Sequence, residues 1–143
     1  MLKQIPSIIS PDLLKILHEM GHGDEVVLGD GNFPAASHAN RLIRCDGHDI
    51  PGLLDAIMQL LPVDTYVEQP IHLMQVVEGD STPVPMIWKD YEEILGNYQV
   101  SRDQIGFVER FAFYERAKKA HAIVATSEQA LYANIILKKG VIS

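Results

Sequence analysis

The chain has 143 residues, of which 47% are hydrophobic, enough for one folded domain with a real core and too apolar for a disordered segment. Its 12 basic and 19 acidic residues give a net charge of −7, which disfavours nucleic-acid binding, and no apolar run is long enough to cross a membrane. The single cysteine, Cys45, cannot form an internal disulfide and the amino terminus lacks a signal-peptide pattern, so we expect a cytoplasmic protein.

Residues 1–77 are predicted to contain two helices and three strands. Ser10 is a typical N-cap for a helix that begins at Pro11 and stops at Gly21. A second helix follows Asp49 and reaches Leu61, where Pro62 ends it. Short apolar or β-branched runs indicate strands at residues 25–28, 41–45 and 71–77.

The remainder of the chain continues this alternation. Helices are expected at 85–95 and 113–120, and strands at 106–110, 122–126 and 134–138. Alternating helices and apolar strands predict a single α/β domain, residues 1–143, whose mainly parallel sheet is flanked by helices on both faces. In such sheets ligands bind beyond the carboxyl ends of the strands, which is where Asp30 follows the first strand.

Two titratable side chains, His22 and Asp30, bracket that first strand on glycine-rich turns. Imidazole gives and takes protons near neutral pH, and loops on a rigid scaffold commonly hold catalytic groups. The pair therefore indicates a proton-transfer site, in which a nearby Asp30 would raise the pKa of the imidazole. The structural alternatives are a helix-capping histidine and an Asp-Gly turn.

A zinc-protease pattern, His18-Glu19-Met20-Gly21-His22, occurs in the same region. Both histidines would have to lie on one continuous helix, but Gly21 and Gly23 surround the second. Zinc also needs a third protein ligand, and no spaced motif supplies one. We therefore predict no metal site, and the remaining histidines form no ligand-spaced set.

Aromatic and hydrogen-bonding residues gather in two later segments. Residues 110–117 place Arg110 and Tyr114 beside two phenylalanines, and Tyr132-Ala133-Asn134 forms the second cluster. Apolar rings next to polar groups suit a sugar, whose C–H face is apolar and whose hydroxyls need partners. An asparagine amide can both donate to and accept from a hydroxyl. The alternative for the first segment is core packing.

Together these segments resemble the L-fucose mutarotase family, which is related to D-ribose pyranase. The resemblance lies in Gly21-His22-Gly23-Asp24 with Asp30-x-x-Phe33-Pro34, in Arg110-Phe111-Ala112-Phe113-Tyr114-Glu115-Arg116-Ala117, and in the stretch from Tyr132 to Val141. The segment from Arg110 to Ala117 is specific to the fucose branch.

The resemblance implies an isomerase of carbohydrate metabolism that interconverts the α and β anomers of a pyranose without a cofactor. It implies binding of a monosaccharide such as L-fucose, and a ring-shaped, decamer-like homo-oligomer with active sites near subunit contacts. His22 would be the proton donor, with Tyr114 and Asp64 in further acid–base roles. The substrate contacts would be Asp30, Arg110, Tyr132, Asn134 and Met74.

Three other functions compete with this hypothesis. A D-ribose pyranase-like enzyme would convert pyranose to furanose forms. A non-catalytic monosaccharide-binding module would keep Asp30, Arg110 and Asn134 but would not need His22. A zinc hydrolase would need the metal site discussed above. The sequence leaves open whether Tyr114, Asp64 or Asp30 is the proton-transfer partner of His22.

Overall fold

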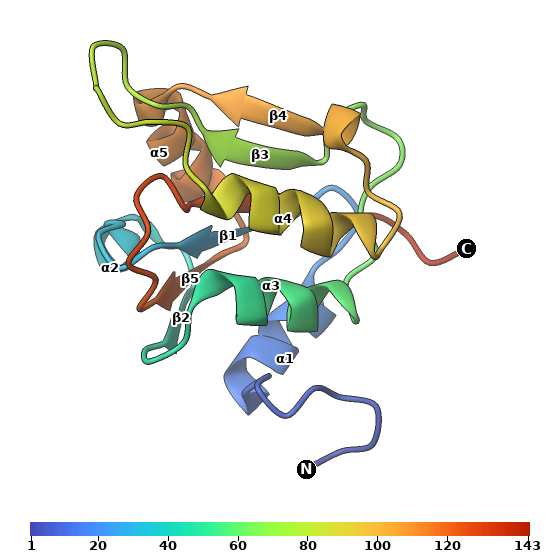
Figure 1. Cartoon of the computed structure of the whole chain (residues 1–143). Helices are drawn as coiled ribbons and strands as arrows, with labels where there is room; N and C mark the ends of the chain where they lie inside the picture. The colour runs from blue at the N-terminus through green and yellow to red at the C-terminus, as the bar shows by residue number, and fades with distance from the viewer.

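A six-stranded sheet forms the centre of the computed structural model, which describes residues 1–143 (Figure 1). The strands are β1 (Glu25–Gly29), β2 (Leu42–Cys45), β3 (Ile71–Met74), β4 (Ile105–Val108), β5 (Ala122–Thr126) and β6 (Ile135–Lys138), in the order β2-β5-β1-β6-β3-β4. The pairs β1–β5, β2–β5 and β3–β4 are parallel. Strand β6 is antiparallel to both of its neighbours, β1 and β3, so it alone runs against the other five.

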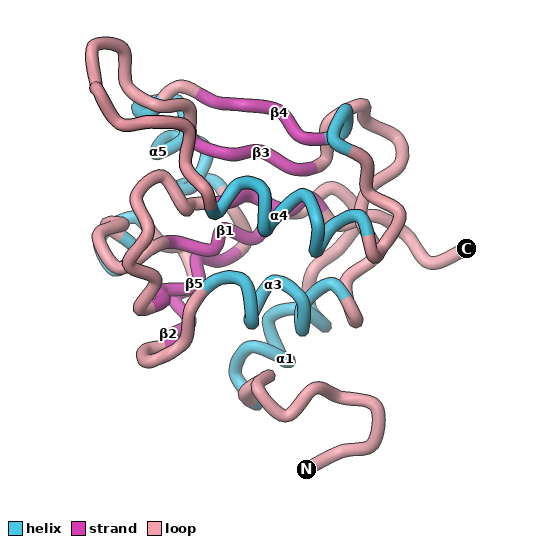
Figure 2. Tube along the Cα trace, viewed as in Figure 1, coloured by secondary structure: helices cyan, strands magenta, loops and turns pink.

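Helices cover both faces of this sheet (Figure 2). Helices α1 (Pro11–Glu19), α3 (Ile50–Met58) and α4 (Ile87–Gly96) contribute to the larger core, and α2 (Ala35–His38) and α5 (Arg110–Lys119) to the smaller core on the opposite face. Along β1, Val26 and Leu28 belong to the larger core and Val27 to the smaller, as the alternation of a strand requires. The predicted α/β domain with a mainly parallel sheet and helices on both faces is confirmed.

The element boundaries follow local hydrogen bonding. Ser10 caps α1 by accepting from the Leu13 N–H at 3.1 Å. Helix α5 begins at Arg110, earlier than predicted, because the Glu109 carboxylate accepts from the N–H groups of the next turn. The predicted extensions of a helix to residue 61 and of a strand to residue 77 were wrong, since α3 ends at residue 58 and β3 at residue 74.

Two short elements were not predicted, namely α2 and a 3₁₀ turn at Arg102–Gln104. Both span fewer residues than the helical periodicity needs in order to be visible in a sequence. None of the helices combines the length and the apolar character needed to span a bilayer.

The reversed strand β6 determines which loops meet. The chain leaves β5 at Thr126, turns through residues 127–134 and re-enters the sheet in the opposite direction. Residues 132–134 therefore lie at the same edge as the carboxyl ends of β1, β3 and β4. At the opposite edge, the end of β6 lies beside the segment that precedes β1 and the segment that precedes β3, as the Asp64 N–H donating to the Lys138 carbonyl shows.

Candidate active site

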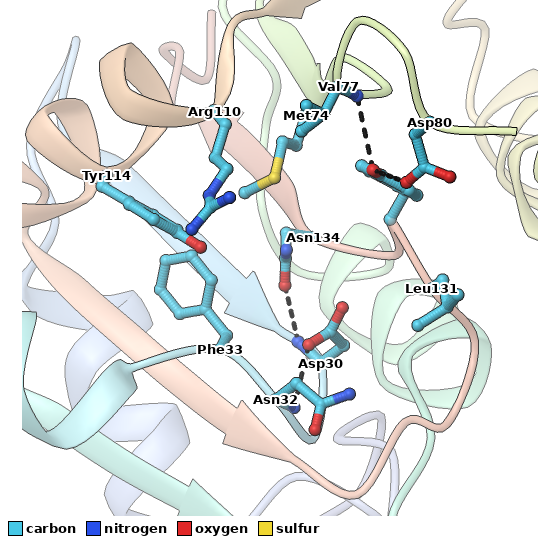
Figure 3. A pocket seen from close by; sticks show the side chains of 11 residues that line it. Asp30, Asn32, Phe33, Met74, Val77, Asp80, Arg110, Tyr114, Leu131 and Asn134 are labelled. Carbon is cyan, nitrogen blue, oxygen red and sulfur yellow. Dashed lines mark hydrogen bonds between the residues drawn. The ribbon is translucent and has the colours of Figure 1, made fainter. Parts of the chain in front are cut away.

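A cavity of about 230 Å³ opens at the carboxyl ends of β1, β3 and β4 (Figure 3). This is the edge at which ligands bind in open α/β sheets. Its lining brings together five of the residues predicted from the sequence as substrate contacts, and Tyr114. The lining residues are Asp30, Asn32, Phe33, Met74, Val77, Asp80, Arg110, Tyr114, Leu131, Tyr132 and Asn134.

Asp30 lies at the floor of this cavity and is only 8% exposed. Its backbone N–H donates to Oδ1 of Asn134 at 2.8 Å, and its Oδ1 accepts from the Asn32 N–H at 3.0 Å (Figure 3). Burial raises the pKa of Asp30, and the hydrogen bonds from surrounding backbone N–H groups oppose that rise only in part. The cavity thus contains a positioned acceptor whose charge is poorly solvated.

Arg110 and Tyr114 form the opposite wall, one helical turn apart on α5 (Figure 3). The guanidinium carbon of Arg110 is 5.7 Å from the centre of the Tyr114 ring, and that ring packs edge-on against Phe33 at 5.6 Å. No carboxylate pairs with Arg110. Its N–H donors are consequently free to bind ligand oxygens.

The segment from Tyr132 to Asn134 is held from behind by α4. Tyr132 has a φ of 56°, a left-handed conformation that is uncommon for a bulky residue. The Trp88 indole N–H donates to the Tyr132 carbonyl at 2.8 Å, and the Tyr91 hydroxyl donates to the Ala133 carbonyl at 2.6 Å. These bonds to successive carbonyls fix the strained backbone, and with it the side chains of Tyr132 and Asn134.

His22 and Asp64 lie together at the opposite edge of the sheet. Nε2 of His22 is 3.1 Å from Oδ1 of Asp64, and the Tyr66 N–H donates to the same oxygen at 3.0 Å. Burial would raise the pKa of Asp64, but the hydrogen bonds from Tyr66 and His22 outweigh it and lower the pKa below its usual value. The Asp64 side chain, 4% exposed, therefore remains a carboxylate that orients the imidazole.

The expected proximity of Asp30 to His22 was wrong within one chain. The five residues of β1 separate the two, a distance of roughly 17 Å at about 3.3 Å per residue. Neither His22 nor Asp64 lines the cavity. Helix α1 also ends at Glu19, before His22, so His18 and His22 do not share the helical face that the zinc motif requires.

Sequence reasoning missed five lining residues, of which Asp80 is the most polar. Asp80 belongs to the loop that follows β3, and a polar loop beyond a strand's carboxyl end is a signal that could have identified it. Val77 was assigned to the predicted strand at residues 71–77, and Leu131 stands between Ala130 and Tyr132, so nothing in the sequence marked either as a lining residue. The remaining two are Asn32 and Phe33.

Comparison with known proteins places this site in a family context. Residues 3–142 match the RbsD / FucU transport protein family. Human "Fucose mutarotase" is 51% identical over 150 residues, covering 99% of this chain and 95% of that protein. "L-fucose mutarotase" of Histophilus somni (strain 2336) is 50% identical over 141 residues, covering 99% of this chain and 97% of that protein.

Solved structures share the fold. The fucose mutarotase of Streptococcus pneumoniae, solved in complex with L-fucose, is 57% identical with a TM-score of 0.95, covering 99% of this chain and 100% of that chain. Bacillus subtilis RbsD complexed with D-ribose has a TM-score of 0.72 with both chains fully covered, but at 22% identity it supports the fold alone. Because the match extends over almost every residue, this chain belongs to the RbsD / FucU family.

Proposed function

We propose that this protein is an L-fucose mutarotase, an isomerase that interconverts the α and β anomers of the pyranose without a cofactor. The observation that carries the proposal is the cavity itself. It presents two carboxylates, a free guanidinium, two amides and two phenols around a space of monosaccharide size. The 57% identity to a fucose mutarotase solved with L-fucose supports the same sugar.

The lining suits a 6-deoxy sugar because it offers both polar and apolar groups. Asp30 accepts from sugar hydroxyls and Arg110 donates to them. Asn134 fixes the backbone of Asp30 by accepting a hydrogen bond from its N–H. Met74 and Leu131, on different sides of the cavity in Figure 3, are apolar side chains against which a methyl group or a C–H face can pack.

Anomerisation requires an acid and a base that exchange roles. The acid protonates the ring oxygen while the base removes the proton from the anomeric hydroxyl, and the bond between the ring oxygen and C1 breaks to give the aldehyde. After rotation about the bond to C1, the hydroxyl attacks the other face and both proton transfers reverse. Such assistance is typically worth about 10²–10⁴-fold, enough for sugars that already mutarotate unaided.

His22 serves as the acid, with Asp64 holding its Nε2 so that Nδ1 is left for the sugar. Since β1 separates His22 from the cavity of its own chain, the histidine that completes each site belongs to a second copy. A closed ring of identical subunits repeats such a contact at every interface. We place this homo-oligomer in the cytoplasm, where the buried free thiol of Cys45 stays reduced.

Asp30 and Tyr114 are the two cavity groups suited to act as the base. The pKa of Asp30 is raised towards the working pH, as a general base requires, and Tyr114 lies on the facing wall. Replacing each by its isostere, Asp30→Asn and Tyr114→Phe, distinguishes them. The variant that loses the base has a lower maximal exchange rate, whereas loss of a mere contact raises the half-saturating sugar concentration.

The test is NMR saturation transfer between the α and β anomeric protons of L-fucose, with catalytic amounts of protein. We expect accelerated exchange with the native chain and background exchange with His22→Ala. His18→Ala, which changes an exposed histidine of α1, is the matched control and should behave as the native chain. Acceleration by His22→Ala equal to that of the control would refute the assigned role.

The same experiment separates the rival functions. A ribose pyranase-like enzyme would accelerate the pyranose–furanose exchange of D-ribose more than the anomeric exchange of L-fucose. A binding module would broaden the fucose resonances without accelerating exchange. Absence of acceleration for L-fucose in the presence of binding would therefore overturn the proposed activity while leaving the sugar site intact.

A further inference from the structure

Asp80 lines the cavity from the loop between β3 and α4, which projects beyond the sheet edge in Figure 1. Its Oδ2 accepts a hydrogen bond from the Tyr132 hydroxyl, fifty-two positions away in the sequence. Its Oδ1 accepts from the Thr82 N–H at 2.8 Å and from the Thr82 hydroxyl at 2.6 Å. Both carboxylate oxygens thus have partners, and the bond from Tyr132 ties the loop to the strained segment.

The direction of the Tyr132 hydrogen bonds follows from the chemistry of these partners. A carboxylate only accepts, so the phenol must donate its single hydrogen to Asp80. The Val77 N–H only donates, at 3.3 Å, so it occupies one lone pair of the phenol oxygen. Since a hydroxyl oxygen has two lone pairs, one acceptor position remains. In Figure 3 Val77 and Asp80 lie together on the same side of the cavity.

From this geometry we propose that Asp80 is a positioning residue, which commits the Tyr132 hydroxyl hydrogen so that the phenol meets the sugar as an acceptor. The inference rests on the proposed function, because it assigns a role within the same sugar site. As a consequence, hydrogen-bond acceptors and donors lie on different sides of the cavity. Acceptors, Asp30 and Tyr132, lie across from the guanidinium donors of Arg110, and a sugar hydroxyl that must donate on one side and accept on the other fits in one orientation.

Near neutral pH, the neighbouring groups keep Asp80 charged and the Tyr132 hydroxyl protonated. Hydrogen bonds from Thr82, and then from Tyr132, lower the pKa of Asp80, so it stays charged. The bond to that carboxylate raises the pKa of Tyr132, so the phenol stays protonated. Tyr132 is therefore a contact for the substrate and not the base.

Asp80→Asn tests the role because it keeps the shape and changes the polarity. With Oδ1 still accepting from the two Thr82 donors, the amide NH₂ faces Tyr132 and donates to it, which frees the phenol hydrogen. We expect the half-saturating fucose concentration to rise roughly three- to tenfold, as for loss of one hydrogen bond, with the maximal exchange rate within about twofold of the native value. Asp46→Asn, at an exposed carboxylate paired with Arg44, is the control.

Tyr132→Phe and the double variant Asp80→Asn/Tyr132→Phe complete a double-mutant cycle. If Asp80 acts through the phenol, Tyr132→Phe raises the half-saturating concentration similarly, and adding Asp80→Asn to it has no further effect. Multiplicative effects, or an Asp80→Asn variant that behaves as the Asp46→Asn control, would overturn the proposal. Because Asp80 is exposed and lies in a loop, neither outcome is obscured by unfolding.

A spectroscopic measurement separates this proposal from the proposed function. The Cζ resonance of Tyr132, assigned by its loss in Tyr132→Phe, should shift in Asp80→Asn and stay in place in Asp46→Asn, whether or not the protein accelerates exchange. A native chain without exchange activity but with this shift would refute the mutarotase function and retain the Asp80–Tyr132 link. An unchanged resonance would refute the link itself.

Discussion

Asp30 illustrates, at the scale of a single residue, how function opposes stability. Its carboxylate is buried at the cavity floor, and that burial raises its pKa. The folded state therefore holds the proton more tightly than the unfolded state, so Asp30 favours folding at low pH and that contribution is lost as the pH rises through its folded pKa. At neutral pH the charged group lowers stability, a cost that a binding site accepts in return for an acceptor.

Asp30→Asn should consequently raise the melting temperature at pH 7 while reducing fucose exchange. The amide oxygen can still accept from the Asn32 N–H, so the local turn remains. The gain should shrink as the pH falls towards the raised pKa, because the native carboxyl then becomes neutral as well. Calorimetry of both proteins at several pH values between 4 and 7 checks this. A gain that is independent of pH would contradict the assigned cause.

His72 predicts the opposite dependence on pH. Burial, followed by the charge of Arg116, lowers its pKa to about 4, and Arg116 donates to its Nδ1 at 3.1 Å while also pairing with Glu25. Since the unfolded pKa is about 6.5, the stabilisation is present above that pH and is lost as the pH falls from 6.5 through 4. Lys138 adds positive charge to the same group.

His72→Asn removes the titrating ring while its amide oxygen keeps an acceptor for Arg116. The melting temperature of this variant should fall less steeply between pH 6.5 and pH 4 than that of the native chain. His48→Asn, at an exposed position, controls for the loss of a histidine. Parallel pH profiles for the native chain and His72→Asn would contradict a half-buried imidazole that stays neutral in the folded state.

At the scale of elements, α4 acts as a support for the site although it contributes none of the cavity-lining residues. Trp88 and Tyr91 reach from this helix to two successive carbonyls of the segment that bears Tyr132 and Asn134. The two members of each hydrogen-bonded pair are more than forty residues apart in the sequence, so the support exists only in the folded chain. A change in α4 should therefore alter sugar binding at a distance.

Tyr91→Phe should show this effect. The hydroxyl is buried, and its removal leaves the Ala133 carbonyl without a partner, which costs about 1–3 kcal/mol of stability. We expect denaturant unfolding to show that loss, together with a raised half-saturating fucose concentration. Tyr98→Phe removes a hydroxyl bonded to Asp55 on α3, away from the cavity, and should leave fucose exchange unchanged. Equal sugar affinity in the two variants would contradict the supporting role.

At the scale of the whole molecule, the two ends of the sheet hold different parts of the proposed chemistry. The cavity lies at the carboxyl ends of β1, β3 and β4, and the His22–Asp64 pair lies at the amino end of β1. One chain cannot bring both to one sugar, which is why the proposed site combines two subunits.

Subunit mixing tests that arrangement. His22→Ala and Asp30→Asn chains, each with reduced exchange alone, should exchange fucose faster when refolded together, because about one quarter of the sites in a random assembly receive both native residues. The native chain, refolded in the same way, gives the reference exchange rate. If mixing restores nothing while hetero-oligomers are detected, His22 and Asp30 of different subunits do not complete one site.

Much of this protein was determined by local sequence signals. N-caps, apolar periodicity and glycine stops located the principal helices and strands, because these depend on residues close together in the chain. The residue types at Arg110, Tyr114 and Asn134 indicated a sugar site, and the resemblance to the L-fucose mutarotase family added Asp30. The structure brings all four to one cavity.

The tertiary structure decided everything that depends on distant contacts. Strand direction is set by pairing, so nothing within residues 135–138 revealed that β6 runs antiparallel to its neighbours. That reversal brings Tyr132 to the cavity. The length of β1 likewise separates His22 from Asp30. The imidazole instead pairs with Asp64, forty-two positions away in the sequence, a contact that only the folded sheet creates.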